Sequence, residues 1–406
     1  MLNTLQYGWR NLWRNTRRTC ITLVAVTLST AILIASYGLM DGLMKHAVSN
    51  ATNLMVGEVQ VHAPGYLADH SIYKALTEPD LILRAAKQKN VAAAPRRYGY
   101  GLVAVGSKSA GARFWGVEPA LERTTFDLAQ HLDQGRFLSE DPQRGVVLGQ
   151  KLAQSLQAQI GSELVVVVQA ADGSLGNDLY TVTGILKSAG DSIDRNAALI
   201  HATDFVELFV SGERIHEVAL NSRGMMSLDR LKAMLSIAAP EEEIKSWPQL
   251  MPEVSDMVNL FDAFIWIFGL IFLLAAGMGV MNTMLMATYE RIREFGILKA
   301  LGATPWRILW DVAVEAIVLA AVGTVFGTIL GLAGSYYLQE VGLDLSIFAG
   351  TYSVGGVAFD PIWRATISAE MVYIPVVLML IISLVACLYP AALAARLDPV
   401  RAIHRP

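Results

Sequence analysis

Four long apolar runs constrain the fold of this chain more than any other feature of its sequence. They cover about residues 21–40, 261–289, 311–338 and 371–394. Each reaches the roughly 20 residues that an α-helix needs to cross a bilayer. Buried helices of a large soluble core are the alternative, but only 17% of the 406 residues are charged, against about 25% in soluble domains. The runs therefore predict four transmembrane helices.

The basic residues indicate how these helices cross the membrane. Four arginines precede the first run, four basic residues separate the second run from the third, and three arginines follow the fourth. The segment 339–370 contains one arginine and four acidic residues. Because lysine and arginine concentrate in cytoplasmic segments, we expect 1–20, 290–310 and 395–406 to be cytoplasmic. The segment 339–370 and the long segment 41–260 then lie outside.

The first run has to be distinguished from a cleaved signal peptide. Signal peptides have an apolar core of about 7–15 residues, whereas this run is longer and lacks a clear small-residue cleavage site. We therefore interpret it as a retained anchor. Upstream, one apolar stripe beside arginines is typical of an interfacial helix over 1–20, with an irregular basic flank as the alternative. The stripe consists of Leu2, Leu5, Trp9, Leu12 and Trp13.

The segment 41–260 is long enough to form one or two domains with real cores. Residues 144–169 have the pattern of a strand, an amphipathic helix, a glycine turn and a buried strand. Residues 180–187 alternate as a strand does, and 197–209 has the pattern of a strand followed by a helix. These patterns predict an α+β domain. The stretch 57–137 contains strand-like runs and turns, and we expect it to be a separate β-rich lobe inserted into that domain.

No pattern in the chain indicates catalysis or a metal site. The stretch 101–109 nearly spells a phosphate-binding loop, but Ser107 separates Lys108 from the second glycine, so a β-hairpin turn fits better. Metalloprotease and serine-nucleophile motifs are missing. The two cysteines, Cys20 and Cys387, provide no disulfide framework. A net charge of −4 argues against a nucleic-acid partner.

The segment 289–306 combines charged residues with a regular apolar pattern. Gly302 fits a helix stop, Thr304 the next N-cap and Pro305 the first helical position. A short helix, a sharp turn and re-entry into the membrane are therefore predicted, with a plain loop as the alternative. The apolar residues that recur every three positions are Ile292, Phe295, Leu298 and Leu301.

Four stretches resemble one known family. Residues 277–304, GMGVMNTMLMATYERIREFGILKALGAT, resemble the signature of the FtsX-like, MacB-type (type VII) permeases of ABC transporters. The tail YPAALAARLDPVRAI, 389–403, is similar to that family's ending. Residues 144–153, RGVVLGQKLA, with 178–187, DLYTVTGILK, resemble the periplasmic core domain of MacB-type members. The resemblance covers most of the chain.

This resemblance implies an α-helical membrane protein of the cell inner membrane, with four transmembrane helices and a large α+β periplasmic domain, the MacB-like porter core. It also implies that the helix at 289–302 is a coupling helix that docks on a separate cytoplasmic ATPase dimer. ATP and magnesium would bind to that partner, so this chain needs no cofactor and is not itself an enzyme. The residues matching the coupling motif are Arg293, Glu294, Phe295, Gly296, Lys299 and Gly302.

Individual roles follow from the chemistry of these positions. Phe295 is expected to be an apolar anchor, Glu294 and Lys299 to pair with charges of the ATPase, and Gly296 to permit close approach. Glu315, in the second turn of the third run, is an intramembrane carboxylate for which we expect snorkelling or a role facing the ATPase. Two small-residue patterns, at 277–279 and 323–331, favour close helix packing.

The layout resembles that of the lipoprotein-releasing subunits LolC and LolE, which take acylated proteins from the outer leaflet. An apolar cavity at the periplasmic end of the first two runs would suit acyl chains, although packing or lipid contact is the alternative for each residue. A second permease copy or a homologous permease, and a periplasmic lipoprotein carrier, are the further partners implied. The expected cavity residues are Ile34, Tyr37, Met40, Leu43, Met44, Phe261, Phe264, Ile265 and Phe268.

Two other functions compete with lipoprotein release. A MacB-like permease would expel peptides or small hydrophobic molecules through an adaptor and an outer-membrane channel. An FtsX-like protein would signal across the membrane to a periplasmic hydrolase. A coiled-coil external domain would favour signalling, and the sequence contains no heptad run there.

Overall fold

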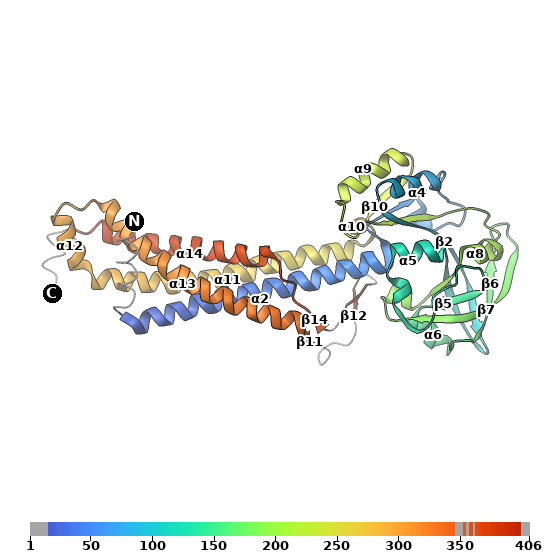
Figure 1. Ribbon diagram of the computed structural model, residues 1–406, viewed down its shortest axis with the longest axis horizontal. Coiled ribbons are helices and arrows are strands. Elements are labelled where there is room, and N and C mark those ends of the chain that lie inside the picture. The colour runs from blue at the N-terminus through green and yellow to red at the C-terminus, as the bar shows by residue number, and fades with distance from the viewer. Residues whose placement is uncertain (1–14, 346–351, 355–356, 360–361, 399–406) are drawn as a thin grey trace. The chain divides into compact units, whose positions relative to one another are not determined.

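The computed structural model of the chain describes residues 15–345, 352–354, 357–359 and 362–398 (Figure 1). The chain divides into two units, which we describe separately. Among the described residues, 15–44, 259–345 and 362–398 form a helical unit, and 45–258 with 352–354 and 357–359 form an α/β unit. Residues 1–14 of the predicted interfacial helix, with its whole apolar stripe, lie outside the described residues, as do residues 399–406 of the predicted tail. Residues 16–20 belong to the first long helix.

Four long helices make up most of the helical unit, and each is long and apolar enough to cross a membrane. This confirms the four predicted membrane helices. All four extend beyond the predicted spans, because a helix continues past the apolar run until a capping signal stops it. The four are α2 (Thr16–Asn50), α11 (Pro252–Glu290), α13 (Pro305–Glu340) and α14 (Ala369–Ala395), with the short α12 (Ile292–Ala300) between α11 and α13.

A stripe of glycines on α13 lets α2 approach closely. A Cβ atom added at Gly323, Gly327 or Gly331 would lie 2.6–2.8 Å from side-chain atoms of Val26, Thr30 and Ile34 on α2. Thr27 also donates a hydrogen bond of 3.1 Å to the backbone carbonyl of Gly323. The small-residue pattern at 323–331 therefore packs two helices together, as the sequence predicted.

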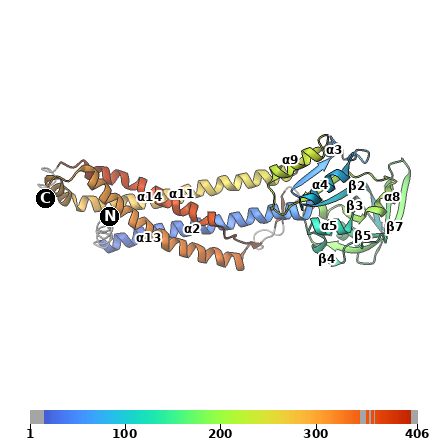
Figure 2. The ribbon, with the colours of Figure 1, turned by 45° about the horizontal axis from the view of Figure 1, so that its top comes forward.

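The α/β unit is built on one sheet of ten strands, counted over the described residues (Figure 2). The order is β10-β1-β9-β2-β3-β8-β5-β7-β4, and β6 pairs with β2 and β7. Most pairs are antiparallel, while β3–β8 and β5–β7 are parallel. The strands are β1 (Val59–His62), β2 (Ala92–Val105), β3 (Lys108–Val117), β4 (Leu132–Gly135), β5 (Gly145–Leu148), β6 (Glu163–Gln169), β7 (Leu175–Leu186), β8 (Ala197–His201), β9 (Glu217–Asn221) and β10 (Glu243–Ser246).

The strands of 57–137 do not form a separate lobe. Strand β1 lies between β9 and β10, β2 pairs with β9, and β3 pairs with β8. The early and late halves of the domain are therefore interleaved in one sheet. Local strand patterns cannot reveal such pairing, because the partners are more than 100 residues apart for β1 and β9.

Several local predictions are confirmed. Strands β2 and β3 form an antiparallel hairpin through Gly106, whose φ of +57° favours glycine, so 101–109 is no phosphate-binding loop. Residues 144–169 form β5, a helix, a turn at Gly161 and β6, and 197–209 form β8 followed by a helix. The helices α4 and α9 pack side by side through Ile82 and Leu231 (Figure 2). The helices of the unit are α3 (Tyr66–Asp69), α4 (Pro79–Gln88), α5 (Pro119–Thr125), α6 (Gln150–Leu156), α7 (Asp191–Asp194), α8 (Ala202–Phe209), α9 (Leu228–Ala238) and α10 (Trp247–Leu250).

Candidate functional site

The short helix α12 is a discrete element with defined ends. Arg291 breaks the helical run between α11 and α12, with φ −110° and ψ 13°. Gly302 follows the helix with φ +93°, a conformation that glycine adopts without strain. Thr304 has the extended backbone of an N-cap, and Pro305 is the first residue of α13. The predicted helix, stop and restart are therefore all present, and a plain loop is excluded.

One side of α12 is held by the chain itself. Phe295 is only 2% exposed and packs against Ile308 and Val312 of α13 and against Ala391 of α14. Gly296 is buried beside it. The Phe295 ring, expected to be an apolar anchor for the ATPase, is thus already covered by residues of this chain.

Lys299 also contacts the chain rather than open solvent. Its Nζ atom donates hydrogen bonds to the backbone carbonyls of Ala395, at 2.9 Å, and Leu397, at 2.6 Å. The last carbonyls of a helix lack intrahelical partners and carry partial negative charge, so a lysine stabilises them. Lys299 therefore ties α12 to the C-terminal end of α14.

The opposite side of α12 is open. Arg293 and Glu294 are exposed, and Leu298 and Leu301 are 41% and 80% exposed. Gly302 is exposed as well. This open surface therefore presents apolar area beside both signs of charge. Of the six predicted coupling residues, Arg293, Glu294 and Gly302 are accessible.

Arg291 connects the start of α12 to α13. Its Nε atom donates to Glu294 Oε2 at 2.9 Å, and its Nη1 atom donates to Glu315 Oε2 at 3.0 Å. The guanidinium also lies 5.0 Å from the centre of the Phe295 ring. Glu315 is buried, so the ion pair offsets the cost of keeping its carboxylate away from water. This ion pair therefore ties Glu315 of α13 to the corner between α11 and α12.

An apolar crevice of about 140 Å³ lies between α2, α11 and α14. Two of the predicted cavity residues, Tyr37 and Ile265, line it. Trp266 and Leu270, also in the lining, are 60% and 54% exposed, so the crevice opens at the surface of the helical unit. The other lining residues are Leu33, Gly269, Leu273, Ile374, Pro375 and Leu378.

The remaining predicted cavity residues lie elsewhere. Ile34 is fully buried against Gly331 of α13, and Leu43 and Met44 are buried too. Met40 is half-buried. The three phenylalanines of α11 form a row along the helix, with ring centres 6.4 Å apart for the first pair and 6.3 Å for the second. These are Phe261, Phe264 and Phe268, and the last two are 51% and 56% exposed.

The sequence does not indicate that α14 contributes to the crevice. Pro375 lies inside α14, and Gly269 has no side chain to fill the space opposite Leu33. A proline ring and a glycine in facing apolar runs are a weak signal for a hollow between helices. The sequence alone does not say which runs face each other.

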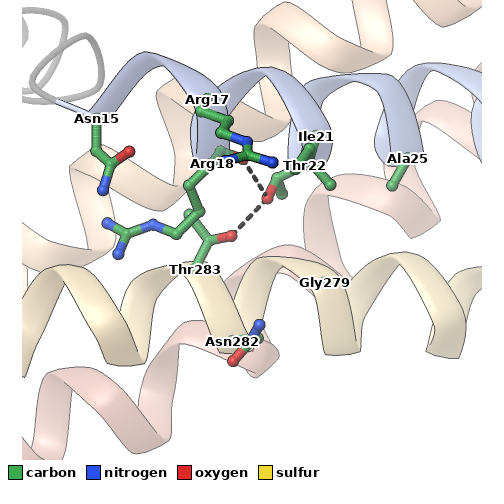
Figure 3. A pocket seen from close by; sticks show the side chains of 9 residues that line it. All are labelled: Asn15, Arg17, Arg18, Ile21, Thr22, Ala25, Gly279, Asn282 and Thr283. Carbon is green, nitrogen blue, oxygen red and sulfur yellow. Dashed lines mark hydrogen bonds between the residues drawn. The ribbon is translucent and has the colours of Figure 1, made fainter.

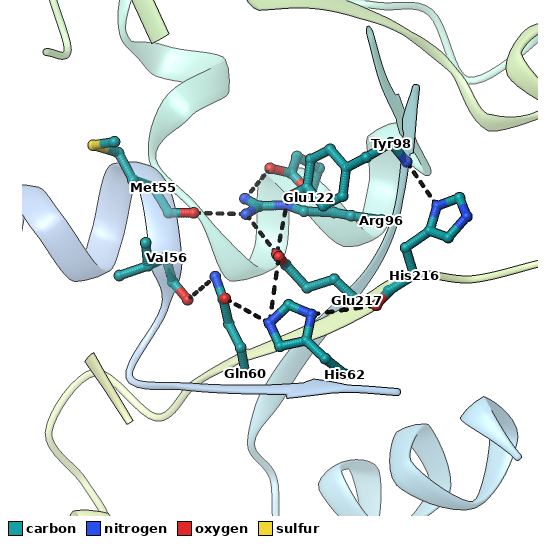
Figure 4. A network of polar contacts seen from close by, with 9 residues as sticks. All are labelled: Met55, Val56, Gln60, His62, Arg96, Tyr98, Glu122, His216 and Glu217. Carbon is teal, nitrogen blue, oxygen red and sulfur yellow. Dashed lines mark hydrogen bonds and ion pairs between the residues drawn. The ribbon is translucent and has the colours of Figure 1, made fainter. Parts of the chain in front are cut away.

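In the α/β unit, a buried polar cluster surrounds Arg96 of β2 (Figure 4). Arg96 Nη2 lies 2.6 Å from Glu122 Oε1 of α5, and Nη1 lies 3.2 Å from Glu217 Oε1 of β9. Nη1 also donates a 2.6 Å hydrogen bond to the carbonyl of Met55, in the π-helical turn Ala51–Val56 that follows α2. Because each charge is paired, the cluster fastens this turn to the sheet.

Two histidines extend the same cluster. The Tyr66 ring stacks between His62 and His216, with ring centres 5.4 and 5.6 Å away. His216 Nδ1 accepts a hydrogen bond from the Tyr98 backbone N–H at 2.9 Å, which requires a neutral ring. Burial lowers the pKa of both His62 and His216, and the Glu217 carboxylate opposes this change.

Comparison with protein families gives two matches that together cover most of the chain. Residues 19–237 match the MacB-like periplasmic core domain, and residues 266–399 match the FtsX-like permease C-terminal region. The first match alone spans more than half of the 406 residues.

Individual relatives have low sequence identity to this chain but align over most of its length. The lipoprotein-releasing system transmembrane protein LolC of Neisseria meningitidis serogroup B is 21% identical over 398 residues, covering 95% of this chain and 94% of the relative. The macrolide export ATP-binding/permease protein MacB of Hyphomonas neptunium is 26% identical, covering 98% of this chain but only 60% of the relative. The crystal structure of the periplasmic region of MacB from Actinobacillus actinomycetemcomitans aligns with a TM-score of 0.36 at 17% identity, covering 47% of this chain and 89% of that one.

Proposed function

We propose that this chain, which belongs to the family of ABC transporter permeases with a MacB-like periplasmic core domain, extracts lipoproteins from the outer leaflet of the inner membrane. In this proposal the permease works with a separate ATPase, and that ATPase binds ATP and magnesium. In this proposal the termini and α12 are cytoplasmic. The α/β unit and the start of α14 are then on the periplasmic side.

The apolar crevice carries this proposal. A lipoprotein is held in the membrane by its acyl chains, so its extraction needs an apolar surface that the chains enter from the bilayer. The crevice is apolar, lies beside the second and third turns of α14 and is bordered by exposed Trp266 and Leu270. Transfer of each methylene group into it offsets about 0.8 kcal/mol of the cost of leaving the bilayer.

The force that drives extraction enters at α12. The open side of α12, with Arg293, Glu294 and Leu301, is the surface that we assign to the ATPase. Phe295 and Lys299 act behind it, because they join α12 to α13 and α14. A displacement of α12 by the ATPase is then passed to α14, whose other end lines the crevice.

The exposed aromatic row of α11 is the surface through which a second permease subunit would contact this chain. Phe264 and Phe268 are exposed on the helical unit, and we assign this face to the neighbouring permease, either another copy or a homologous chain. An ATPase dimer presents two docking grooves, so two permeases are needed to occupy both. A periplasmic lipoprotein carrier would receive the cargo.

Photo-crosslinking tests this function. A photoreactive amino acid at Leu270, in the crevice, is compared with one at Tyr336, which is 60% exposed on α13 and outside the crevice. In membranes containing the ATPase and an acylated protein, we expect cargo crosslinks at position 270 and few at 336. Equal crosslinking of a non-acylated form of the same protein would contradict the proposal.

Efflux is the second candidate, favoured by the alignment of the MacB relative over 98% of this chain. In that case the crevice would admit peptides or small hydrophobic molecules, and an adaptor with an outer-membrane channel would complete the pathway. Crosslinking of such a molecule at position 270, with no acylated protein captured, would favour efflux. Absence of any cargo, together with ATP-dependent binding of a periplasmic hydrolase, would favour signalling.

A further inference from the structure

A second cavity lies at the opposite end of the helical unit, between the first turns of α2 and the last third of α11 (Figure 3). Its volume is about 280 Å³. It belongs neither to the crevice nor to the open side of α12. The nine lining residues are Asn15, Arg17, Arg18, Ile21, Thr22, Ala25, Gly279, Asn282 and Thr283.

One part of this cavity is lined by side chains that donate hydrogen bonds to anions. Arg17 and Arg18 line it, together with the carboxamides of Asn15 and Asn282, and none of the nine lining residues is acidic. Figure 3 shows Asn15 and Arg18 of the α2 end extending toward α11, and Thr283 of α11 pointing back toward α2. Arginine and carboxamide N–H groups are the donors that hold phosphate oxygens.

Arg18 forms an ion pair, and one of its N–H groups has no hydrogen-bond partner among the described residues. Its Nη1 atom lies 3.1 Å from Glu290 Oε1, at the last residue of α11. Its Nε atom is buried and has no hydrogen-bond partner among the residues that the structure describes. A buried donor without a partner costs free energy that an acceptor in the cavity would recover. The Glu290 carboxylate neutralises part of the Arg18 charge, so Arg17, which is exposed, supplies the rest.

The other part of the cavity is apolar and runs along the two helices. Ile21 is 64% exposed, and Ala25 is one helical turn further along α2. On α11, a Cβ atom added at Gly279 would meet no other atom within 4 Å, so the glycine leaves open space there. A ligand that fills the cavity therefore combines an anionic group with an adjoining hydrocarbon chain.

We propose that this cavity binds an anionic phospholipid of the cytoplasmic leaflet, with its phosphate at Arg17 and Arg18 and one acyl chain along Ile21 and Gly279. The proposal rests on the membrane orientation given under the proposed function, but not on the substrate assigned there. Basic cavities at the cytoplasmic ends of membrane helices bind anionic headgroups. The bound lipid would join α2 to α11 directly before the corner at Arg291.

Native mass spectrometry of the delipidated full-length chain in detergent tests this site. Phosphatidylglycerol is titrated against phosphatidylethanolamine and against soluble glycerol 3-phosphate. Two variants address the two halves of the cavity: Arg17→Gln with Arg18→Gln removes the charges, and Gly279→Leu fills the apolar part. The matched controls are Arg307→Gln with Arg396→Gln, both exposed at the same end of the unit, and Gly334→Leu, which also enters open space.

We expect the unaltered chain to prefer phosphatidylglycerol, and the double arginine variant to weaken its binding roughly thirtyfold, as loss of two arginines does at an anionic lipid surface. Gly279→Leu should weaken phosphatidylglycerol binding with all charges present, while both controls bind normally. Thermal unfolding of each variant confirms that it is folded.

Equal binding of phosphatidylethanolamine, or equal loss in the controls, would overturn the proposal. Binding of glycerol 3-phosphate that matches phosphatidylglycerol and resists Gly279→Leu would replace the lipid by a soluble phosphate. No ATPase or cargo is present in this assay, so its failure leaves the proposed transport function standing. Failure of crosslinking at Leu270 would equally leave the lipid site standing.

Discussion

Arg291 Nη1 lies 3.0 Å from Glu315 Oε2, and this ion pair joins the corner between α11 and α12 to the buried face of α13. The two side chains are 18% and 7% exposed. The pair lies where α12 receives force from the ATPase in our proposal. A corner held by a desolvated ion pair passes on a displacement that a flexible loop would absorb.

Replacing Glu315 by glutamine tests that relationship. The amide keeps the size of the side chain but leaves the Arg291 charge only partly compensated, and we expect a loss of about 1–3 kcal/mol in unfolding free energy. Glu294→Gln is the matched control, because it removes the other carboxylate that pairs with Arg291. Glu294 is exposed, and exposed ion pairs contribute only about 0–1 kcal/mol to the unfolding free energy. Thermal unfolding in detergent measures both. Equal effects of the two substitutions would mean that the Glu315 pair has no special role.

Phe295 and Leu301 separate the two sides of α12. Phe295→Ala should destabilise the chain by about 3–5 kcal/mol, because it empties a buried position between α13 and α14. Leu301, 80% exposed, should change stability little when replaced by alanine, yet weaken association with the ATPase. Thermal unfolding and co-purification with the ATPase measure the two effects. A stable Phe295→Ala variant that loses the ATPase would assign the contact to the buried ring instead.

The glycine stripe of α13 should tolerate no side chain at its centre. A Cβ atom at Gly327 would lie 2.6 Å from Thr30 Cβ and 2.7 Å from the Thr27 carbonyl oxygen. We expect Gly327→Ala to lower stability by about 1–3 kcal/mol, as overpacking does. Gly334→Ala on the same helix meets nothing within 4 Å and should be neutral or slightly stabilising. Equal stability of the two variants in detergent would show that α2 and α13 separate easily.

The two buried histidines that flank Tyr66 in the α/β unit predict that the stability of the chain depends on pH. Burial lowers the pKa of His62 and His216 below the ordinary value, so the unfolded chain binds more protons as the pH falls below about 6.5. The contribution of the neutral rings is therefore complete above that pH and is lost progressively below it. The unfolding midpoint of the full chain should fall on acidification, and fall less in His62→Asn. His46→Gln, at an exposed position, should keep the original dependence. A midpoint that rises on acidification would contradict the assignment.

Local signals in the sequence were sufficient for α12 and its surroundings. Gly302, Thr304 and Pro305 determine where one helix stops and the next begins through their own backbone preferences, and the structure places each as predicted. The same holds for the hairpin at Gly106. These features depend on a few neighbouring residues and need no knowledge of distant contacts.

Contacts between distant segments were not predictable in this way. The apolar spacing of α12 identified Phe295 as part of a face, but not that α13 and α14 already cover that face. Nothing in the sequence around Lys299 indicates that its ammonium group contacts the end of α14. The pairing of β1 with β9 and β10, and the contribution of Pro375 to the crevice, depend on tertiary packing in the same way.

Release of an acylated protein from proteoliposomes tests the central claim most directly. The permease, reconstituted with its ATPase and any required second permease, is compared as the unaltered chain, Gly269→Leu and Gly334→Leu. Gly269 lines the crevice, where an added Cβ atom has only Leu33 nearby, at 3.6 Å, whereas Gly334 lies outside it. We predict that Gly269→Leu lowers release about tenfold or more, since burial of a leucine-sized apolar group contributes about 1.5–3 kcal/mol to acyl-chain binding in the crevice. Gly269→Leu should still associate with the ATPase, and Gly334→Leu should release the acylated protein normally. Unchanged release by Gly269→Leu would contradict the assignment of the crevice to acyl chains.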